Sequence, residues 1–190
     1  MRSNRRSGLE NVTSELSSGQ SGTAAEAGEL DRDGRRDFDY LVGAWAIANR
    51  RLVDPLAEGS AEWLEFPSSS QAQSILGGLG NLERYVAPAF PGRGSFEGLS
   101  LRLFDPATSL WRIWWASTAQ TGSLDTPVVG RFADGRGRFE CQDVLNGRPL
   151  HVRYDWKDIT GVSATWEQAF SFDSGETWQP NWIMKLTRES

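Results

Sequence analysis

Five polar side chains lie in phase with apolar or aromatic residues along short alternating segments, and these are the residues best placed to do chemistry. They are Asn49, Arg51, Glu65, Asp143 and Gln168. Side chains of an extended strand alternate between two faces, so Glu65 shares its face with Trp63, and Arg51 shares its face with Trp45. A buried polar group needs a hydrogen-bonding partner. These five residues therefore either pair with one another or meet a ligand.

Each of the five would have a distinct role in a site. Arg51 would anchor a carboxylate or an enolate, while Asn49 and Gln168 would orient the polar ends of a bound molecule. Glu65 or Asp143 could act as a general acid or base, with a pKa raised by burial. We therefore take Glu65, Asp143 and Arg51 as candidate catalytic residues. An ion pair from Arg51 to Glu65 or Asp143 inside the protein explains the same pattern without any site, and both interpretations stay open.

The clearest strand among the elements that must position these residues is Trp111-Arg112-Ile113-Trp114-Trp115. Trp111, Ile113 and Trp115 share one face, and Arg112 and Trp114 share the other. Three indoles in five residues carry more apolar area than one short strand can bury alone. Neighbouring strands must therefore enclose them.

Further extended segments recur about every ten to fifteen residues and are separated by hairpin signals such as Asp134-Gly135 and Asn146-Gly147. The predicted strands cover residues 44–51, 62–66, 71–76, 99–103, 111–116, 127–132, 138–144, 150–156, 163–171 and 178–187. Pro67 and three serines separate the second segment from the third, and residues 87–98 are predicted to form an irregular loop. Consecutive hairpins close most simply into an all-β, up-and-down antiparallel barrel of about 8–10 strands, which we favour over a sandwich.

The 190-residue chain has room for one domain and a tail. Residues 1–36 lack Trp, Phe and Tyr and are predicted to be a disordered polar tail, and residues 37–190 to be the barrel domain. Phe38, Leu41 and Val42 have the one-turn spacing of a short helical plug before the first strand. The absence of a signal-like start and of any long apolar run predicts a cytoplasmic protein with no membrane contact.

Composition excludes several classes of function. The single His151 rules out zinc sites built from several histidines and is predicted to face water, and the single Cys141 rules out an intramolecular disulfide. No Gly-x-Ser-x-Gly elbow occurs, and Gly77-Gly78-Leu79-Gly80 lacks the lysine of a phosphate loop. We therefore expect no metal and no cofactor. A formal charge of −5 and a pI near 5.0 argue against a nucleic-acid partner.

Several motifs together resemble a family of largely uncharacterised bacterial lipocalin-like, calycin-type domains. They are Gly43-x-Trp45 behind its plug, Phe104-Asp105-Pro106, Pro127-Val128-Val129-Gly130-Arg131-Phe132, Asn146-Gly147-Arg148-Pro149, Trp166-Glu167-Gln168-Ala169-Phe170-Ser171 and Asn181-Trp182. The resemblance covers roughly residues 37–188 and implies a calycin-like barrel more firmly than any activity. In lipocalins, the tryptophan of the Gly-x-Trp motif closes one end of the barrel.

One further motif indicates a turn. Ser171-Phe172-Asp173-Ser174-Gly175-Glu176-Thr177-Trp178 resembles the Asp-box of sialidase propellers. Asp173 is predicted to cap the turn amides, Gly175 to take a positive φ, and Trp178 to pack beneath. Only one copy is present, whereas a sialidase would repeat the box in every blade, so the motif predicts a hairpin and no sialidase activity.

The apolar face of each strand is the natural choice for the barrel interior, and a barrel of this size can leave a cavity. This choice also points Leu101 and Leu103 inward. The predicted ligand-binding residues are Trp45, Asn49, Arg51, Trp63, Trp115, Tyr154, Trp166, Gln168 and Trp182. Core filling is the alternative for any one of them.

These observations predict that the protein binds a small hydrophobic or aromatic metabolite in a Trp-lined barrel cavity. The alternative is a barrel enzyme, a cyclase, isomerase or hydrolase, acting on a hydrophobic metabolite by general acid/base catalysis. A third hypothesis is a partner-binding module that uses outward aromatics such as Trp114. A homodimer stays open, because the sequence does not define the oligomeric state.

Overall fold

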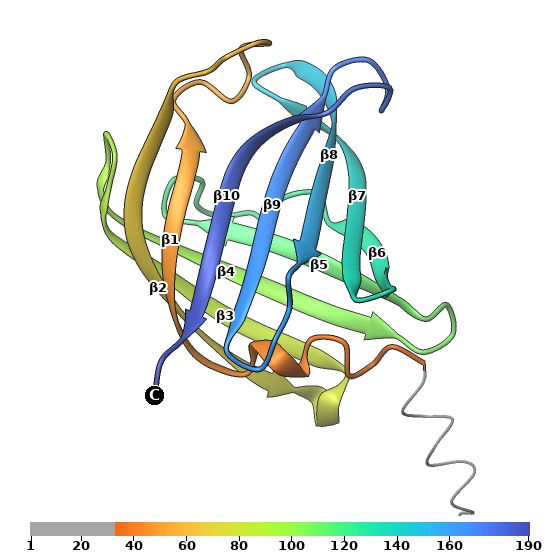
Figure 1. The fold of residues 1–190 in the computed structure, drawn as a ribbon. Coiled ribbons are helices and arrows are strands. Elements are labelled where there is room, and N and C mark those ends of the chain that lie inside the picture. Colours follow the sequence, from red (N-terminus) through yellow and green to blue (C-terminus); the bar gives the residue numbers. More distant parts are fainter. Residues whose placement is uncertain (1–32) are drawn as a thin grey trace, which may run out of the picture.

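Residues 33–190, which the computed structural model describes, form a closed barrel of ten antiparallel strands (Figure 1). Each strand pairs with the next one along the chain, and β10 returns to pair with β1. The predicted all-β, up-and-down barrel is therefore confirmed. The strands are β1 (Gly43–Leu52), β2 (Trp63–Ile75), β3 (Gly80–Phe90), β4 (Gly94–Asp105), β5 (Leu110–Ser117), β6 (Val128–Ala133), β7 (Arg136–Leu145), β8 (Arg148–Lys157), β9 (Ser163–Ser171) and β10 (Gln179–Arg188).

The lower end of the barrel in Figure 1 is closed by the segment that precedes β1. It contains a short 3₁₀ turn, η1 (Asp39–Leu41), so a helical plug is present as predicted. Phe38 is 1% exposed and packs edge-on against Trp111, with ring centroids 5.0 Å apart. The Trp45 indole is fully buried beside the plug and donates a hydrogen bond from Nε1 to the Leu41 carbonyl oxygen, at 2.8 Å. We call this region the closed end.

The predicted boundary between tail and barrel falls inside the part of the chain that contacts the barrel. Residues 33–36 form a bend and a turn, and the Gly34 carbonyl oxygen accepts a hydrogen bond from Trp111 Nε1 at 2.9 Å. Residues 1–32 of the predicted tail lie outside the described residues. Among residues 33–190, no helix has the length and apolar character needed to span a membrane.

The opposite end carries longer loops. Two of the predicted hairpin turns, one at each end of the barrel, have the expected geometry. Asp134 and Gly135 both have positive φ, at 51° and 73°, and so do Asn146 and Gly147, at 51° and 79°. This is the requirement of a two-residue turn whose twist matches that of the flanking strands. Such turns let consecutive strands follow one another around the barrel without a crossover.

Two expectations about strands 2 to 4 are wrong. Strand β2 runs unbroken through Pro67, which pairs with Ala48 and faces outward, so two predicted segments are one strand. Strand β3 continues to Phe90 and β4 begins at Gly94, so most of the predicted irregular loop 87–98 belongs to two strands. The reason is that many inward positions of this region are polar or small, so the apolar alternation that marks the other strands is weakened or reversed.

The reversed phase also places leucines outside the barrel. Leu101 and Leu103 of β4 were expected inside, but the buried positions of this strand are the alternate ones, including Ser100 and Arg102. Leu101 instead pairs with Leu82 of β3 and Trp114 of β5 on the outer surface, where all three are half-buried. Strands β5 to β10 keep the predicted phase: Ile113, for example, is 4% exposed and points into the bore.

Candidate functional site

A cavity of about 320 Å³ occupies the bore above the closed end. Its walls include seven of the predicted site residues, and its far end is bounded by Pro55 and Leu56 of the β1–β2 loop and by Asp125 and Thr126 of the β5–β6 loop. We call this far end the mouth. The volume reaches the lower end of the range typical of small-molecule sites. The seven are Arg51, Trp115, Asp143, Tyr154, Trp166, Gln168 and Trp182.

A belt of five aromatic side chains runs along the cavity wall. Tyr154 packs edge-on against Trp166, and Trp166 against Trp182, with ring centroids 4.9 and 5.9 Å apart. Tyr85 then contacts both Trp182 and Trp115, with centroids 6.1 and 6.0 Å away. Edge-to-face packing of this kind fixes the orientation of each ring. The wall therefore presents flat apolar surfaces in defined positions.

Asn49 lies behind this belt rather than on the cavity surface. It is 2% exposed, and its Nδ2 donates to the Phe66 carbonyl oxygen at 3.1 Å and to Ser68 Oγ at 2.8 Å. Its Oδ1 accepts hydrogen bonds from Tyr85 Oη at 3.0 Å and Trp182 Nε1 at 3.1 Å. The amide therefore has protein partners on both sides, and it orients two aromatic side chains of the wall. Asn49 is a positioning residue, which differs from the expected direct contact with a ligand.

Arg51 lines the cavity near its mouth without a carboxylate partner. Its guanidinium carbon lies 5.6 Å from the Phe90 ring centroid and 5.5 Å from that of Trp182. Burial, together with the charge of Arg93, lowers the pKa of Arg51. Within residues 33–190 its guanidinium makes neither an ion pair nor a hydrogen bond, so the predicted internal bridge to Glu65 or Asp143 is not formed.

Arg102, which the sequence analysis missed, is the second arginine of the cavity and lies at its floor. It is 3% exposed, and its Nη2 lies 2.5 Å from Glu83 Oε2 while its Nη1 donates to Asn81 Oδ1 at 2.9 Å. The guanidinium carbon also lies 5.1 Å from the Phe38 ring centroid. The signal that could have found it is the aromatic pair Phe96 and Phe104, which share the phase of Arg102 in β4.

Two carboxylates lie at the mouth. Asp143 Oδ1 accepts hydrogen bonds from Thr126 Oγ1 at 3.1 Å and from the Val144 amide at 2.7 Å. Burial and the nearby charge of Asp143 raise the pKa of Asp125. Burial, reinforced by both carboxylates, raises the pKa of the Cys141 thiol to about 12. Cys141 is therefore a protonated wall residue rather than a nucleophile.

Tyr154 and Gln168 line the cavity, and protein contacts restrain both. Burial, with smaller contributions from Asp125, Cys141 and Asp143, raises the pKa of Tyr154, so its hydroxyl stays neutral and can donate a hydrogen bond. Gln168 Nε2 donates to Asn181 Oδ1 at 2.7 Å. The side-chain oxygen of Gln168 is thereby left as the acceptor that it can present to a bound molecule.

Besides Asn49, three predicted site residues do not line the cavity. Glu65 and Trp63 are on the outer face of β2, because the unbroken strand puts Phe66, Ser68 and Ser70 inward. There, Arg50 Nε lies 3.3 Å from Glu65 Oε1, and the Arg50 guanidinium carbon lies 5.0 Å from the Trp63 ring centroid. The expected inward orientation of Glu65 and Trp63 is wrong. Trp45 points inward but belongs to the closed end, below the cavity.

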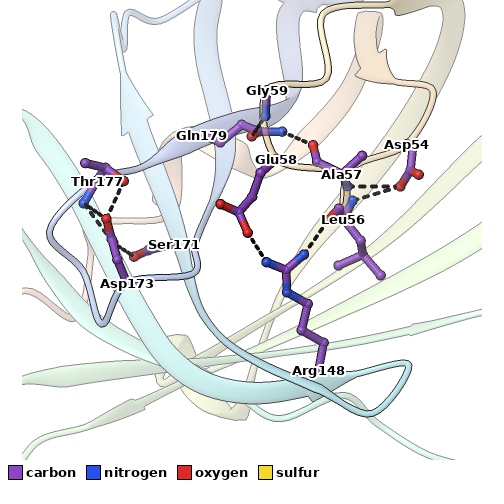
Figure 2. A network of polar contacts seen from close by, with 10 residues as sticks. All are labelled: Asp54, Leu56, Ala57, Glu58, Gly59, Arg148, Ser171, Asp173, Thr177 and Gln179. Atoms are coloured by element: carbon purple, nitrogen blue, oxygen red, sulfur yellow. Dashed lines mark hydrogen bonds and ion pairs between the residues drawn. The ribbon is translucent and has the colours of Figure 1, made fainter.

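The β1–β2 loop, residues 53–62, crosses the mouth, and we call it the strap. Arg148 at the start of β8 donates from Nη1 to the Leu56 carbonyl oxygen at 2.8 Å and pairs through Nη2 with Glu58 (Figure 2). Gln179 of β10 holds the next turn: its Nε2 donates to the Ala57 carbonyl oxygen at 3.1 Å, and its Oε1 accepts from the Gly59 amide at 3.0 Å. Polar contacts with two other strands therefore fix the strap.

The β9–β10 hairpin beside the strap has the predicted Asp-box turn. Asp173 Oδ1 accepts hydrogen bonds from the Thr177 amide at 2.9 Å and from Ser171 Oγ at 2.7 Å (Figure 2). Gly175 has φ 95°, and Trp178 Nε1 donates to its carbonyl oxygen at 3.0 Å. The Thr177 hydrogen bonds lower the pKa of Asp173 to about 2. This aspartate is therefore a structural cap, fully ionised near neutral pH.

The histidine does not contribute to the cavity. His151 of β8 is half-buried, and the cavity-facing positions of that strand are its neighbours in the other phase, such as Val152 and Tyr154. Across residues 33–190, no three His, Cys, Asp or Glu side chains gather in a group that could hold a metal ion.

The closed ten-strand meander with an aromatic bore is an up-and-down antiparallel β-barrel. Two solved structures share it. Rv2717c from M. tuberculosis superposes with a TM-score of 0.55 at 12% identity, covering 83% of this chain and 98% of that one. The S-type phycobiliprotein lyase CpeS from Guillardia theta superposes with a TM-score of 0.56 at 9% identity, covering 84% and 97%. At such identities the likeness shows the fold alone. No protein-family model and no curated protein matches the sequence.

Proposed function

We propose that this protein binds a small hydrophobic or aromatic metabolite in the cavity of the barrel. The observation that carries the proposal is the cavity of about 320 Å³ whose wall includes Trp115, Trp166 and Trp182. Interiors of proteins are normally packed to the density of organic crystals, so an unfilled volume of this size between aromatic faces favours an occupant. The sequence resemblance to bacterial lipocalin-like domains supports the same function.

A pair of matched substitutions on β10 tests the proposal. Met184 lines the cavity, whereas Ile183, next to it, lies on the opposite face of the strand. The probe is 2-acetylnaphthalene, a neutral two-ring ketone, and its affinity is measured by isothermal titration calorimetry. We expect saturable binding to the wild type, at least a tenfold loss in Met184→Trp, which fills the cavity, and less than a twofold change in Ile183→Trp.

Two results would overturn this function. One is the absence of saturable binding of 2-acetylnaphthalene up to its solubility limit. The other is equal affinity of the wild type and Met184→Trp, provided that circular dichroism shows both to be folded, because binding would then lie outside the cavity.

General acid/base catalysis in the same cavity is a second candidate function, favoured by the raised pKa of Asp125 beside Asp143. A carboxylate of raised basicity can remove a proton next to a carbonyl group. Proton exchange of the methyl group of 2-acetylnaphthalene in D₂O, followed by NMR, measures this step. We expect exchange above the buffer rate, reduced by Asp125→Asn and by Asp143→Asn. A rate equal to that of buffer would reject this candidate function.

A further inference from the structure

Arg51 is held in place although nothing in the described chain neutralises its charge. Its guanidinium carbon lies within 5.6 Å of the Phe90 and Trp182 ring centroids, so aromatic rings fix its position. Such contacts stabilise a cation but satisfy none of its five N–H donors. The N–H donors of Arg51 therefore lie on the wall of an open cavity, where a bound molecule can accept their hydrogen bonds.

The charges around Arg51 increase the need for an anion. The charge that acts most strongly on Arg51 is that of Arg93 in the β3–β4 turn, which is positive. Arginine keeps its proton even when partly buried, so this part of the cavity carries a permanent positive charge in a medium of low dielectric constant. An anion placed there gains the Coulomb attraction and the charge-assisted hydrogen bonds together.

The carboxylates of the cavity lie elsewhere. Asp143 is on β7, whereas Arg51 is on β1, and β8, β9 and β10 lie between these two strands. Thr126 Oγ1 and the Val144 amide donate hydrogen bonds to Asp143 Oδ1. Asp125 lies in the β5–β6 loop close enough to Asp143 to feel its charge. Negative charge on a ligand is therefore repelled from the β5–β7 side of the mouth and attracted to β1. This asymmetry orients a ligand that has one charged end.

We propose that the ligand is an aromatic monocarboxylic acid, whose carboxylate binds the Arg51 guanidinium and whose rings lie between Trp115, Trp166 and Trp182. A planar carboxylate matches the paired N–H donors of a guanidinium. The flat body matches the aromatic wall. This inference rests on the proposed function and adds the charge and orientation of the ligand to it.

Two nearly isosteric probes test the inference: 2-naphthoate, which is an anion at pH 7.5, and 2-naphthamide, which is neutral. Calorimetry in low salt measures both affinities for the wild type, for Arg51→Met and for Arg93→Met. Methionine keeps the apolar stem of the arginine, and Arg93 is an exposed neighbour that does not line the cavity, so it controls for the loss of one positive charge.

We expect the wild type to bind 2-naphthoate at least tenfold more tightly than 2-naphthamide. Arg51→Met abolishes this preference by lowering the affinity for 2-naphthoate alone. Arg93→Met changes the ratio of the two affinities less than threefold. Arg51→Lys, which retains the charge without the planar fork, keeps part of the preference. Added salt weakens the binding of 2-naphthoate and leaves the affinity for 2-naphthamide unchanged.

The outcomes separate this inference from the proposed function. Equal affinities of the two probes for the wild type, or equal losses of both in Arg51→Met, overturn the carboxylate inference while leaving a cavity that binds aromatic molecules. If neither probe nor 2-acetylnaphthalene binds, the proposed function fails, and the carboxylate inference fails with it.

Discussion

Two arginines point into the bore, and their surroundings differ. At the closed end, Arg102 has Glu83 and Asn81 as partners and is 3% exposed. At the mouth, the Arg51 guanidinium contacts the Phe90 and Trp182 rings and has no carboxylate partner within residues 33–190. A buried charge that the chain itself neutralises serves the structure, whereas a fixed charge without a counterion next to a cavity is suited to a ligand. The contrast teaches that pairing, and not burial alone, separates the packed half of this barrel from the half available for binding.

The largest expected effect is a loss of stability at the closed end. Arg102→Met leaves Glu83 buried without its partner, which should cost about 3–5 kcal/mol of unfolding free energy. Urea denaturation measures this loss, and the double variant Arg102→Met/Glu83→Gln should recover most of it. Arg51→Met should cost less than about 1 kcal/mol, because no carboxylate is left behind. If the two single variants were equally destabilised, the contrast between the two arginines would be wrong.

Two glycines allow the two ends to be compared by adding one methyl group to each. A Cβ on Gly98 would lie 2.1 Å from the Trp115 ring, and a Cβ on Gly137 would lie 2.7 Å from the Phe132 ring, so both rings must move. We expect Gly98→Ala and Gly137→Ala each to cost about 1–3 kcal/mol. Only Gly98→Ala should also lower the affinity for 2-acetylnaphthalene, by about fivefold, because Trp115 lines the cavity. Equal binding by both variants in calorimetry would contradict the assignment of Trp115 to the site.

The pH dependence of stability should come partly from Asp37 at the closed end. Burial, with the charges of Asp33 and Asp39, raises the pKa of Asp37 to about 6 from its ordinary 3.8. The folded state therefore holds this proton more tightly than the unfolded state, and the associated stability is present below pH 3.8 and lost as the pH rises through 6. After allowance for solvent screening, Asp37→Asn should stabilise the protein by up to about 1 kcal/mol above pH 6. Thermal unfolding at pH 4 and pH 7.5 tests this. If Asp37→Asn stabilised the protein equally at the two pH values, the titration of Asp37 would be excluded as the cause.

The smallest effect on stability is expected at the strap. Arg148→Met removes a part-buried hydrogen bond to Leu56 and an exposed ion pair with Glu58, and surface ion pairs contribute at most about 1 kcal/mol. The exchange of 2-acetylnaphthalene should nevertheless become faster, with stopped-flow dissociation rates raised about threefold, because the strap crosses the mouth. Arg138→Met is the control, since Arg138 pairs with Asp155 on the outside of the barrel and away from the strap. An unchanged dissociation rate in Arg148→Met would mean that the ligand leaves by another path.

The strands with aromatic inward faces could be predicted from the sequence, because large apolar side chains occupy every second position there. Trp111, Ile113 and Trp115 point into the bore as expected. The paired positive-φ turns at Asp134-Gly135 and Asn146-Gly147 were equally predictable, since few residues adopt that geometry. The closed barrel follows from these two kinds of signal.

The strands from β2 to β4 could not be assigned in the same way, because their polarity is inverted. Asn81 and Glu83 point inward while Leu82 and Leu101 cover the outside, so hydrophobicity alone suggests the opposite phase. The partner of Glu83 is Arg102, which lies on the neighbouring strand. For the same reason the sequence could suggest Arg51 but could not show that Glu65 lies outside. Pairing across a sheet is a three-dimensional property.

A crystal structure of the complex with 6-bromo-2-naphthoate tests the central claim most directly, because the anomalous signal of bromine locates the ligand independently of the side chains. We predict one bromine site inside the barrel, with the rings against Trp166 and Trp182 and the carboxylate within hydrogen-bonding distance of the Arg51 guanidinium. A bromine site on the outer surface, or a carboxylate turned towards Arg102 at the floor, would contradict the account.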